Sequence, residues 1–237
     1  HSSNVKHTWI ILLFIYSGIA SLIPVWILLQ PRDYINSHQL IVGLSLIFLS
    51  IFLIQPKIIA PAITNLDKGP PIIPFLFVTI ACGAISGFHG LVSSGTTSKQ
   101  VDKMDDARMI GYGATLGEGS LALAATIAAI AGLSFVNMQN DLCLPWACDF
   151  NNAKAGALNV FINGSSGLLQ QIGLPQSLAT TLIVVLVVSF AATTLDSATR
   201  IQRYIITEFG SATKLKVFEN KYLATLISII PAYFIAT

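Results

Sequence analysis

Charged residues are scarce in this sequence. Of its 237 residues only 10% are Asp, Glu, Lys or Arg, where a soluble globular domain has about 25%. The 13 basic residues barely exceed the 11 acidic ones, so no basic excess points to nucleic acid. Hydrophobic residues, in contrast, make up 54% of the chain. This composition excludes a soluble domain and a nucleic-acid partner. It indicates an integral membrane protein, with the lipid bilayer as its first partner.

Cysteine is scarce too, with three residues in the chain. That number is too small for a secreted domain held together by disulfides. Cys143 and Cys148 can close a small loop if their side of the membrane is oxidising, and two free thiols are the alternative. Histidines and acids do not show the spacing of metal ligands. The sequence therefore predicts neither a metal site nor a cofactor.

Long apolar runs dominate the rest of the sequence. A helix needs about 20 apolar residues to cross the hydrocarbon core with every backbone amide satisfied. We expect an all-α integral membrane protein, residues 1–237 being part of one transmembrane domain. The segment 137–176 is more polar and is predicted to stay on the outer side, with a short interfacial or re-entrant helix over 153–172. About six spans are predicted: 8–29, 39–54, 72–92, 114–136, 178–201 and 222–237.

The ends of the chain and its basic residues add two expectations. The sequence begins at His1 and stops inside the apolar run 222–237, so we expect a piece of a longer polypeptide whose remaining spans pack against this one. The loops after spans one, three and five hold nine basic residues against four on the other side, which places those loops in the cytoplasm. The nine are Arg32, Lys99, Lys103, Arg108, Arg200, Arg203, Lys214, Lys216 and Lys221.

Three ionisable side chains fall within predicted spans: His89, Glu118 and Asp196. A charge in the hydrocarbon costs about 2.5 to 3.5 kcal/mol, so such residues usually have a function. Consecutive spans cross the membrane in opposite directions, so the end of span three, the start of span four and the end of span five lie on the same side. The three side chains can therefore form one polar layer there. The structural alternative is that each is wetted at the interface, or that Asp196 only pairs with Arg200 one helical turn later.

The third span ends in glycines and hydroxyl groups. Glycines 87 and 90 are followed by Ser93, Ser94, Gly95, Thr96 and Thr97. A helix interrupted over 86–98 frees backbone groups that can hold an anion or a dehydrated cation. The alternative is an ordinary helix end followed by a loop rich in Ser and Thr.

An enzyme is the rival class. His89, Ser94 and Asp196 are the residue types of an acyl-transfer triad, but the G-x-S-x-G pattern around the nucleophile is missing. Residue types without geometry are a weak signal. The sequence is therefore predicted not to be an enzyme.

Several blocks resemble the carbon starvation protein A (CstA) family. They occur in family order from about residue 9 to residue 208, so the resemblance covers nearly the whole chain. The blocks are 24–26, 29–34, 81–89, 93–97, 106–108, 111–113, 189–196 and 200–204. The segment 137–176 matches no block of the family.

This resemblance implies a multi-pass transporter of a prokaryotic inner membrane, taking up peptides during carbon starvation and, in some members, pyruvate with protons. It also implies an inverted-repeat fold of the amino-acid, polyamine and organocation type, with broken helices. In this interpretation His89 and 93–97 contact the substrate or the coupling ion, while Thr193, Thr194 and Asp196 line the path.

The coupling ion stays open at this point. Glu118 is the favoured proton acceptor, because a low dielectric favours the neutral form of a carboxyl group. Sodium is the alternative, since hydroxyl and carbonyl oxygens of the same break suit a hard cation. A nutrient sensor or scaffold that binds without transporting is the alternative from another class. The resemblance implies that Arg32 is a gate or contacts an anion. The alternative is that Arg32 is one of the basic loop residues that set the orientation in the membrane.

Overall fold

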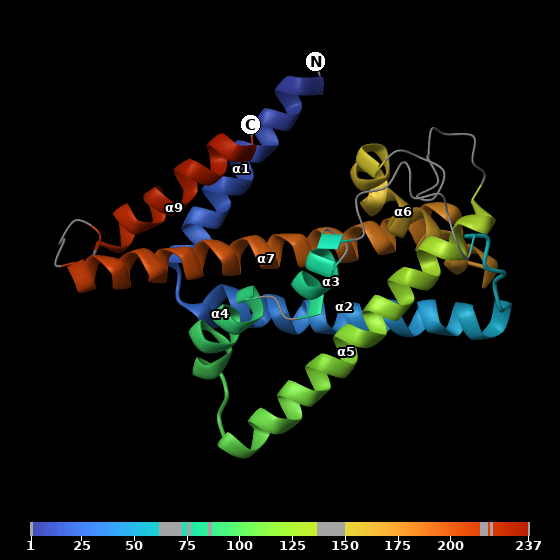
Figure 1. Ribbon diagram of the computed structural model, residues 1–237, viewed down its shortest axis with the longest axis horizontal. Coiled ribbons are helices and arrows are strands. Elements are labelled where there is room, and N and C mark those ends of the chain that lie inside the picture. Colours follow the sequence, from blue (N-terminus) through green and yellow to red (C-terminus); the bar gives the residue numbers. More distant parts are fainter. Residues whose placement is uncertain are drawn as a thin grey trace. The chain divides into compact units, whose positions relative to one another are not determined.

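The chain is all-helical in its described part. The computed structural model describes residues 2–61, 73–74, 77–84, 87–136, 150–213, 218 and 220–236, and Figure 1 draws the other residues as a thin grey trace. No strand occurs within these ranges. The predicted all-α class is thereby confirmed. Cys143 and Cys148 lie outside the described residues, so their pairing stays a prediction.

Ten helical elements are given by the described residues, and the chain divides into two compact units. The first unit comprises His1–Ser37, Leu91–Ser98 and Val188–Thr237, and the second comprises His38–Gly90 and Lys99–Val187. The elements are α1 Ser2–Leu22, α2 Val25–Ile54, α3 Phe77–Ala84, α4 Gly87–Gly95, η3 Thr97–Lys99, α5 Met104–Ile130, η4 Gly132–Phe135, α6 Phe150–Gln171, α7 Gln176–Thr213 and α9 Lys221–Ala236.

Four stretches of the described chain are long and apolar enough to cross a membrane. They are Val25–Ile54, Phe77–Lys99, Met104–Ile130 and Gln176–Thr213. Two shorter apolar helices, His7–Leu22 and Lys221–Ala236, lie where the first and last spans were expected. The described part thus supports four spans by length and composition, and a count of six stays a prediction.

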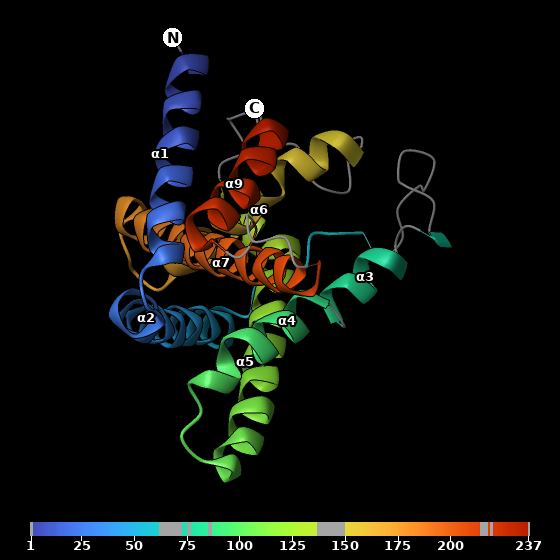
Figure 2. The ribbon, with the colours of Figure 1, turned by 90° about the vertical axis from the view of Figure 1, so that its left-hand side faces the viewer.

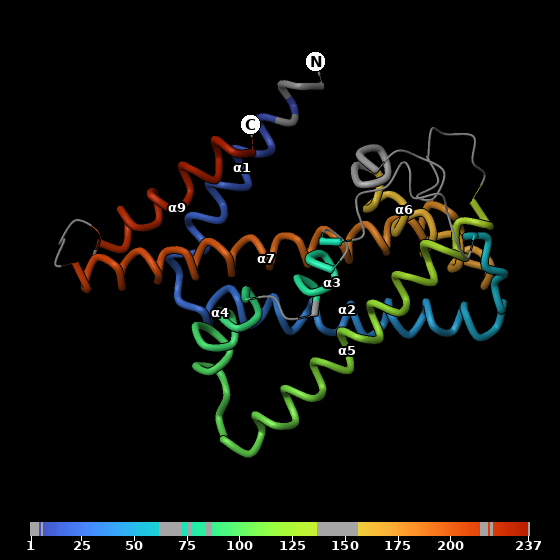
Figure 3. Tube along the Cα trace, viewed as in Figure 1, coloured from blue at the N-terminus to red at the C-terminus, as the bar shows by residue number. Residues whose placement is uncertain are grey.

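The loop expected between the first two spans is a helix. The helix is interrupted at Ile23 and Pro24, and α2 then continues to Ile54. Figure 3 shows the bend between α1 and α2. A residue before proline is pushed out of the helical region, and Pro24 precedes α2, where its missing N–H costs no helical bond. Pro31 lies inside α2 without ending it. The helix bounds therefore differ from the predicted spans 8–29 and 39–54, and the limits of those spans in the membrane stay a prediction.

The fifth span also extends further than predicted. Helix α7 has 38 residues and is about 57 Å long at 1.5 Å per residue. Arg200 and Arg203 therefore lie in a helix, where both are buried, and Arg32 lies in α2. Arg108 lies in α5 and Lys221 begins α9. Five of the nine residues counted as cytoplasmic loop residues thus lie in described α-helices, which removes part of the basis for the predicted orientation.

Small residues bring helices together in the second unit. Helix α6 packs on α5 and on η4, and Ala124 and Ala128 of α5 are fully buried there. A Cβ atom on Gly164 would overlap the carbonyl oxygen of Ala128, and one on Gly132 would overlap the backbone of Gly164. Small residues that allow backbones this close are typical of helix contacts in membranes. Helix α6 has 22 residues, so the helix expected over 153–172 exists but is not short.

In the first unit, α1 and α9 pack against each other, which Figures 1 and 2 show from two directions. Gly18 of α1 faces α9, because a Cβ atom there would approach the Cδ1 atom of Ile229 to 2.9 Å. Tyr233 of α9 meets Phe14 of α1 edge to face, with ring centroids 6.2 Å apart. A close backbone approach and an aromatic contact therefore hold this helix pair.

We predict that Gly164→Ala lowers the stability of the full-length protein. The new methyl group overlaps backbone that cannot rotate away, and overpacking of this kind costs about 1 to 3 kcal/mol. The control is Gly156→Ala in the same helix, where a Cβ atom meets nothing within 4 Å. Thermal unfolding of the detergent-solubilised protein measures both. Equal melting temperatures for the two variants would contradict this helix contact.

Candidate functional site

A charged cluster lies in the first unit and joins three helices. Arg32 of α2 pairs through Nη1 with Oδ2 of Asp196 on α7. The same nitrogen donates to the hydroxyl of Tyr16 on α1 at 2.7 Å, and that hydroxyl lies 3.5 Å from Asp196 Oδ2. Asp196 is 1% exposed. A buried carboxylate is thus held between a guanidinium and a phenol.

Arg200 does not pair with Asp196 by hydrogen bonding. Its Nη2 donates to the backbone carbonyl of Ala20 at 2.7 Å, and its side chain is buried. The alternative that Asp196 only pairs with the arginine one turn later is therefore wrong. Asp196 is paired by Arg32, 164 residues away in the sequence.

Neutral polar contacts flank the charged cluster. The amide of Asn36 donates to Thr193 Oγ1 at 2.6 Å, and the hydroxyls of Ser17 and Thr199 share a bond of 2.6 Å. Thr193, Asp196 and Thr199 follow one another at spacings of three on α7, which keeps them on one side of the helix. Thr193 and Asp196, both predicted site residues, thus share one buried polar surface.

Several buried polar atoms of this cluster have no hydrogen-bond partner among the described residues. Leaving a buried polar group unsatisfied costs about 1 to 3 kcal/mol, and more for a charged group. The atoms are Ser21 Oγ, Arg32 Nε, Arg32 Nη2, Asp196 Oδ1 and Arg200 Nε. The cluster therefore presents both donors and an acceptor that can bind a further polar group.

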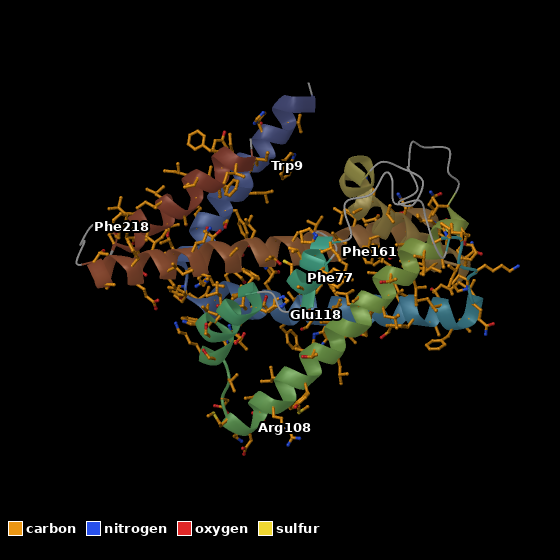
Figure 4. All side chains as sticks on the ribbon, in the orientation of Figure 1. Trp9, Phe77, Arg108, Glu118, Phe161 and Phe218 are labelled. Carbon is orange, nitrogen blue, oxygen red and sulfur yellow. The ribbon has the colours of Figure 1, made fainter. Side chains whose placement is uncertain are left out.

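A second pair of ionisable groups lies in the second unit. The Nε2 atom of His89 on α4 is 3.9 Å from Oε1 of Glu118 on α5, and the two side chains are 55% and 62% exposed. Figure 4 labels Glu118 partway along α5 and Arg108 near the start of that helix. The structure thus brings two predicted site residues together, in an exposed setting. A single layer that also includes Asp196 stays a prediction.

The Ser and Thr segment is more helical than predicted. The break was predicted over 86–98; residue 86 lies outside the described residues, 87–95 are helical, and the helix ends within the predicted range, after Gly95. The hydroxyl of Ser94 donates to the carbonyl of Leu91 at 3.3 Å, which satisfies a short polar side chain without ending the helix. The chain leaves the helix at Thr96, which is 6% exposed and whose hydroxyl has no partner within the described ranges.

The other predicted site residues occupy ordinary positions. Ser93 is exposed on α4 and Thr97 begins η3, while the exposed Thr194 donates to the carbonyl of Phe190 at 3.0 Å. Among the described residues, no group of three His, Cys, Asp or Glu side chains that could hold a metal occurs.

Sequence reasoning missed the partners of Asp196. Arg32 and Asn36 were placed in a polar loop, whereas they are four residues apart on one helix and both bind α7. Their spacing was a usable signal, because residues four apart share a helix face. Tyr16 and Ser17 sit in an apolar run with no pattern that marks them as site residues.

Comparison with known proteins identifies the family. The model of the family described as carbon starvation protein CstA matches residues 2–144 and 147–237. The chain belongs to this family. The resemblance found in the sequence blocks is thereby confirmed, and it extends to 137–144 and 147–176, which were expected to match no part of the family. With the four apolar helices it makes the chain part of a multi-pass membrane protein.

Curated relatives carry the names of transporters, not of enzymes. The peptide transporter CstA of Bacillus subtilis (strain 168) is 32% identical over 230 residues, covering 85% of this chain and 38% of the relative. The pyruvate/proton symporter BtsT of Escherichia coli (strain K12) is 46% identical over 123 residues, covering 48% of this chain and 17% of the relative. The peptide transporter CstA of Escherichia coli (strain K12) is 40% identical over 133 residues, covering 54% of this chain and 19% of the relative.

The chain spans 38% or less of the length of these relatives. No solved structure matches it. The prediction that the chain is not an enzyme agrees with these relatives.

We predict that the two ionisable pairs differ in their effect on stability. Asp196→Ala leaves a buried guanidinium without its acid, which costs about 3 to 5 kcal/mol. His89→Ala breaks an exposed pair worth less than about 1 kcal/mol. Thermal unfolding of the full-length protein compares the two variants. Similar losses from both would contradict the burial of the charged cluster.

Proposed function

We propose that the protein containing this chain is a secondary active transporter that takes up a small nutrient, peptides or pyruvate, together with protons during carbon starvation. Family membership supports this proposal, as do relatives named as a peptide transporter and as a pyruvate/proton symporter. We further propose an inverted-repeat fold completed by spans outside this chain, in a prokaryotic inner membrane.

The buried pair of Arg32 and Asp196 is the observation that carries this function. Both residues lie in helices long and apolar enough to cross a membrane. Charges at membrane depth are costly and mark substrate or ion pathways. A transporter needs such groups on its path, whereas a purely structural helix contact can be built from apolar residues at no desolvation cost.

Glu118 is the proposed proton acceptor. It lies on α5, whose stretch Met104–Ile130 is apolar enough to span, and His89 is its neighbour. Its exposure in this chain leaves the carboxylate open to a proton from water. The imidazole of His89 lies within reach and can share that proton.

The hydroxyl groups supply the remaining contacts in this proposal. Thr96 holds a buried hydroxyl that has no partner among the described residues, and Ser93, Ser94, Gly95 and Thr97 surround it in sequence. Thr193 and Thr194 line the path beside Asp196. Sodium is the alternative coupling ion, because hydroxyl oxygens are ligands for a hard cation.

Uptake into proteoliposomes tests this function. The full-length protein is given labelled pyruvate or a labelled dipeptide, with proton and sodium gradients imposed separately. Accumulation driven by the proton gradient is expected. Accumulation driven only by the sodium gradient would show that sodium, and not the proton, is the coupling ion. Binding without accumulation or exchange of label would contradict transport and favour a nutrient sensor.

We predict that Glu118→Gln abolishes proton-driven accumulation while the protein still folds. The amide keeps the size of the side chain but cannot take up the proton. The matched control is Asp105→Asn, an exposed acid in the first turn of the same helix, which should leave uptake unchanged. Uptake by Glu118→Gln equal to that of the original protein across a pH series would remove Glu118 from the mechanism.

A further inference from the structure

Among the described residues, the guanidinium of Arg32 uses only one of its three nitrogens. Nη1 serves both Asp196 and Tyr16, while Nε and Nη2 are buried and have no hydrogen-bond partner in the described part of the chain. We propose that this Nε and Nη2 edge binds the carboxylate of the transported nutrient, and that Asp196 positions the guanidinium for it. This inference rests on the proposed transport function and names the chemical group by which the substrate is recognised.

The geometry of the free edge suits a carboxylate. Arginine carries its donors in a rigid planar fork, and two parallel N–H groups match the two oxygens of a carboxylate. Nε and Nη2 form one such pair of donors. Lysine offers a point charge instead and cannot reproduce this bidentate contact.

Asp196 fixes the orientation of the fork without occupying that edge. It accepts from Nη1 through Oδ2, and Tyr16 accepts from the same nitrogen. Both contacts come from helices other than α2, so the guanidinium is held from two sides. An orientation fixed before binding reduces the entropy lost when the ligand binds.

The ionised side chains around Arg32 balance in charge. Asp196 interacts electrostatically with Arg200 as well as with Arg32, so its charge keeps a partner when Arg32 also serves a ligand. Asp33, next to Arg32 in sequence, is the other acid nearby. Two arginines and two acids therefore lie within electrostatic reach of Arg32 or Asp196. A compact monoanion adds a charge that Arg32 can meet directly.

Pyruvate and the C-terminus of a peptide both carry such a carboxylate. The test measures binding to the detergent-solubilised full-length protein of labelled pyruvate, of a dipeptide and of the amide of that dipeptide. The variants are Arg32→Gln, Arg32→Lys and Asp196→Asn. Arg108→Gln is the control, because Arg108 is exposed at the start of α5. Melting temperature and gel filtration confirm that each variant folds.

Substitution of Arg32 and substitution of Asp196 should change the affinity for the carboxylate in opposite directions. Arg32→Gln should weaken carboxylate binding at least about tenfold, the loss expected for charge-assisted hydrogen bonds, and Arg32→Lys should restore part of it. Asp196→Asn keeps an oxygen that accepts from Nη1 but removes the competing charge, so binding should tighten. The dipeptide amide should bind weakly to every variant, and Arg108→Gln should change nothing. The ligand whose binding weakens in Arg32→Gln and tightens in Asp196→Asn, pyruvate or the dipeptide, is the one that supplies the carboxylate.

A purely structural ion pair gives a different pattern. Equal weakening by Arg32→Gln and Asp196→Asn would overturn the proposal, as would equal affinity for the dipeptide and its amide. Unchanged binding in a folded Arg32→Gln variant whose uptake is still driven by a proton gradient would overturn this inference and leave the transport function standing. Failure of the original protein to accumulate either substrate is the separate result that removes the function itself.

Discussion

The ion pair between Arg32 and Asp196 determines how the first unit is built. Removing two charges from water is costly, and their attraction compensates only when the geometry is good. Asp196 is 1% exposed, so α2 and α7 must meet at this point for the carboxylate to be paired at all. Tyr16 brings α1 to the same place, and the contacts Asn36 to Thr193 and Ser17 to Thr199 extend it along α7.

The same interaction explains where sequence reasoning succeeded and where it failed. Apolar runs predicted the helices, and Asp196 stood out as an acid in such a run. The segment 30–38 looked like a loop because its composition is polar, yet Arg32 and Asn36 find their partners more than 150 residues away. A local pattern cannot show such a partner. Only the four-residue spacing of the two side chains hinted at a shared helix face.

Helix α7 illustrates the second limit. Its arginines at 200 and 203 were taken as loop residues because charges usually end a span. In the structure they are buried, and Arg200 binds the carbonyl of Ala20. By contrast, His89 and Glu118 were expected near each other from topology alone, and they are. Contacts between spans that follow closely in sequence were predictable here, whereas the contact across the chain was not.

The two ionisable pairs differ in a way that suits two tasks. The buried cluster has fixed geometry and unsatisfied polar atoms among the described residues, which is what recognition of a ligand group requires. The exposed pair of His89 and Glu118 is open to proton exchange. In a proton-coupled transporter one site must recognise the nutrient and another must change its protonation. The described residues of this chain hold one ionisable pair of each kind, buried and exposed.

Exchanging the two charges of the buried pair is the most direct measurement of this arrangement. Arg32→Asp alone and Asp196→Arg alone should each lower the melting temperature of the full-length protein strongly, since each places two like charges together in a buried position. The double exchange, Arg32→Asp with Asp196→Arg, should recover much of that loss. A double variant no more stable than the weaker single variant would contradict a contact between these two residues.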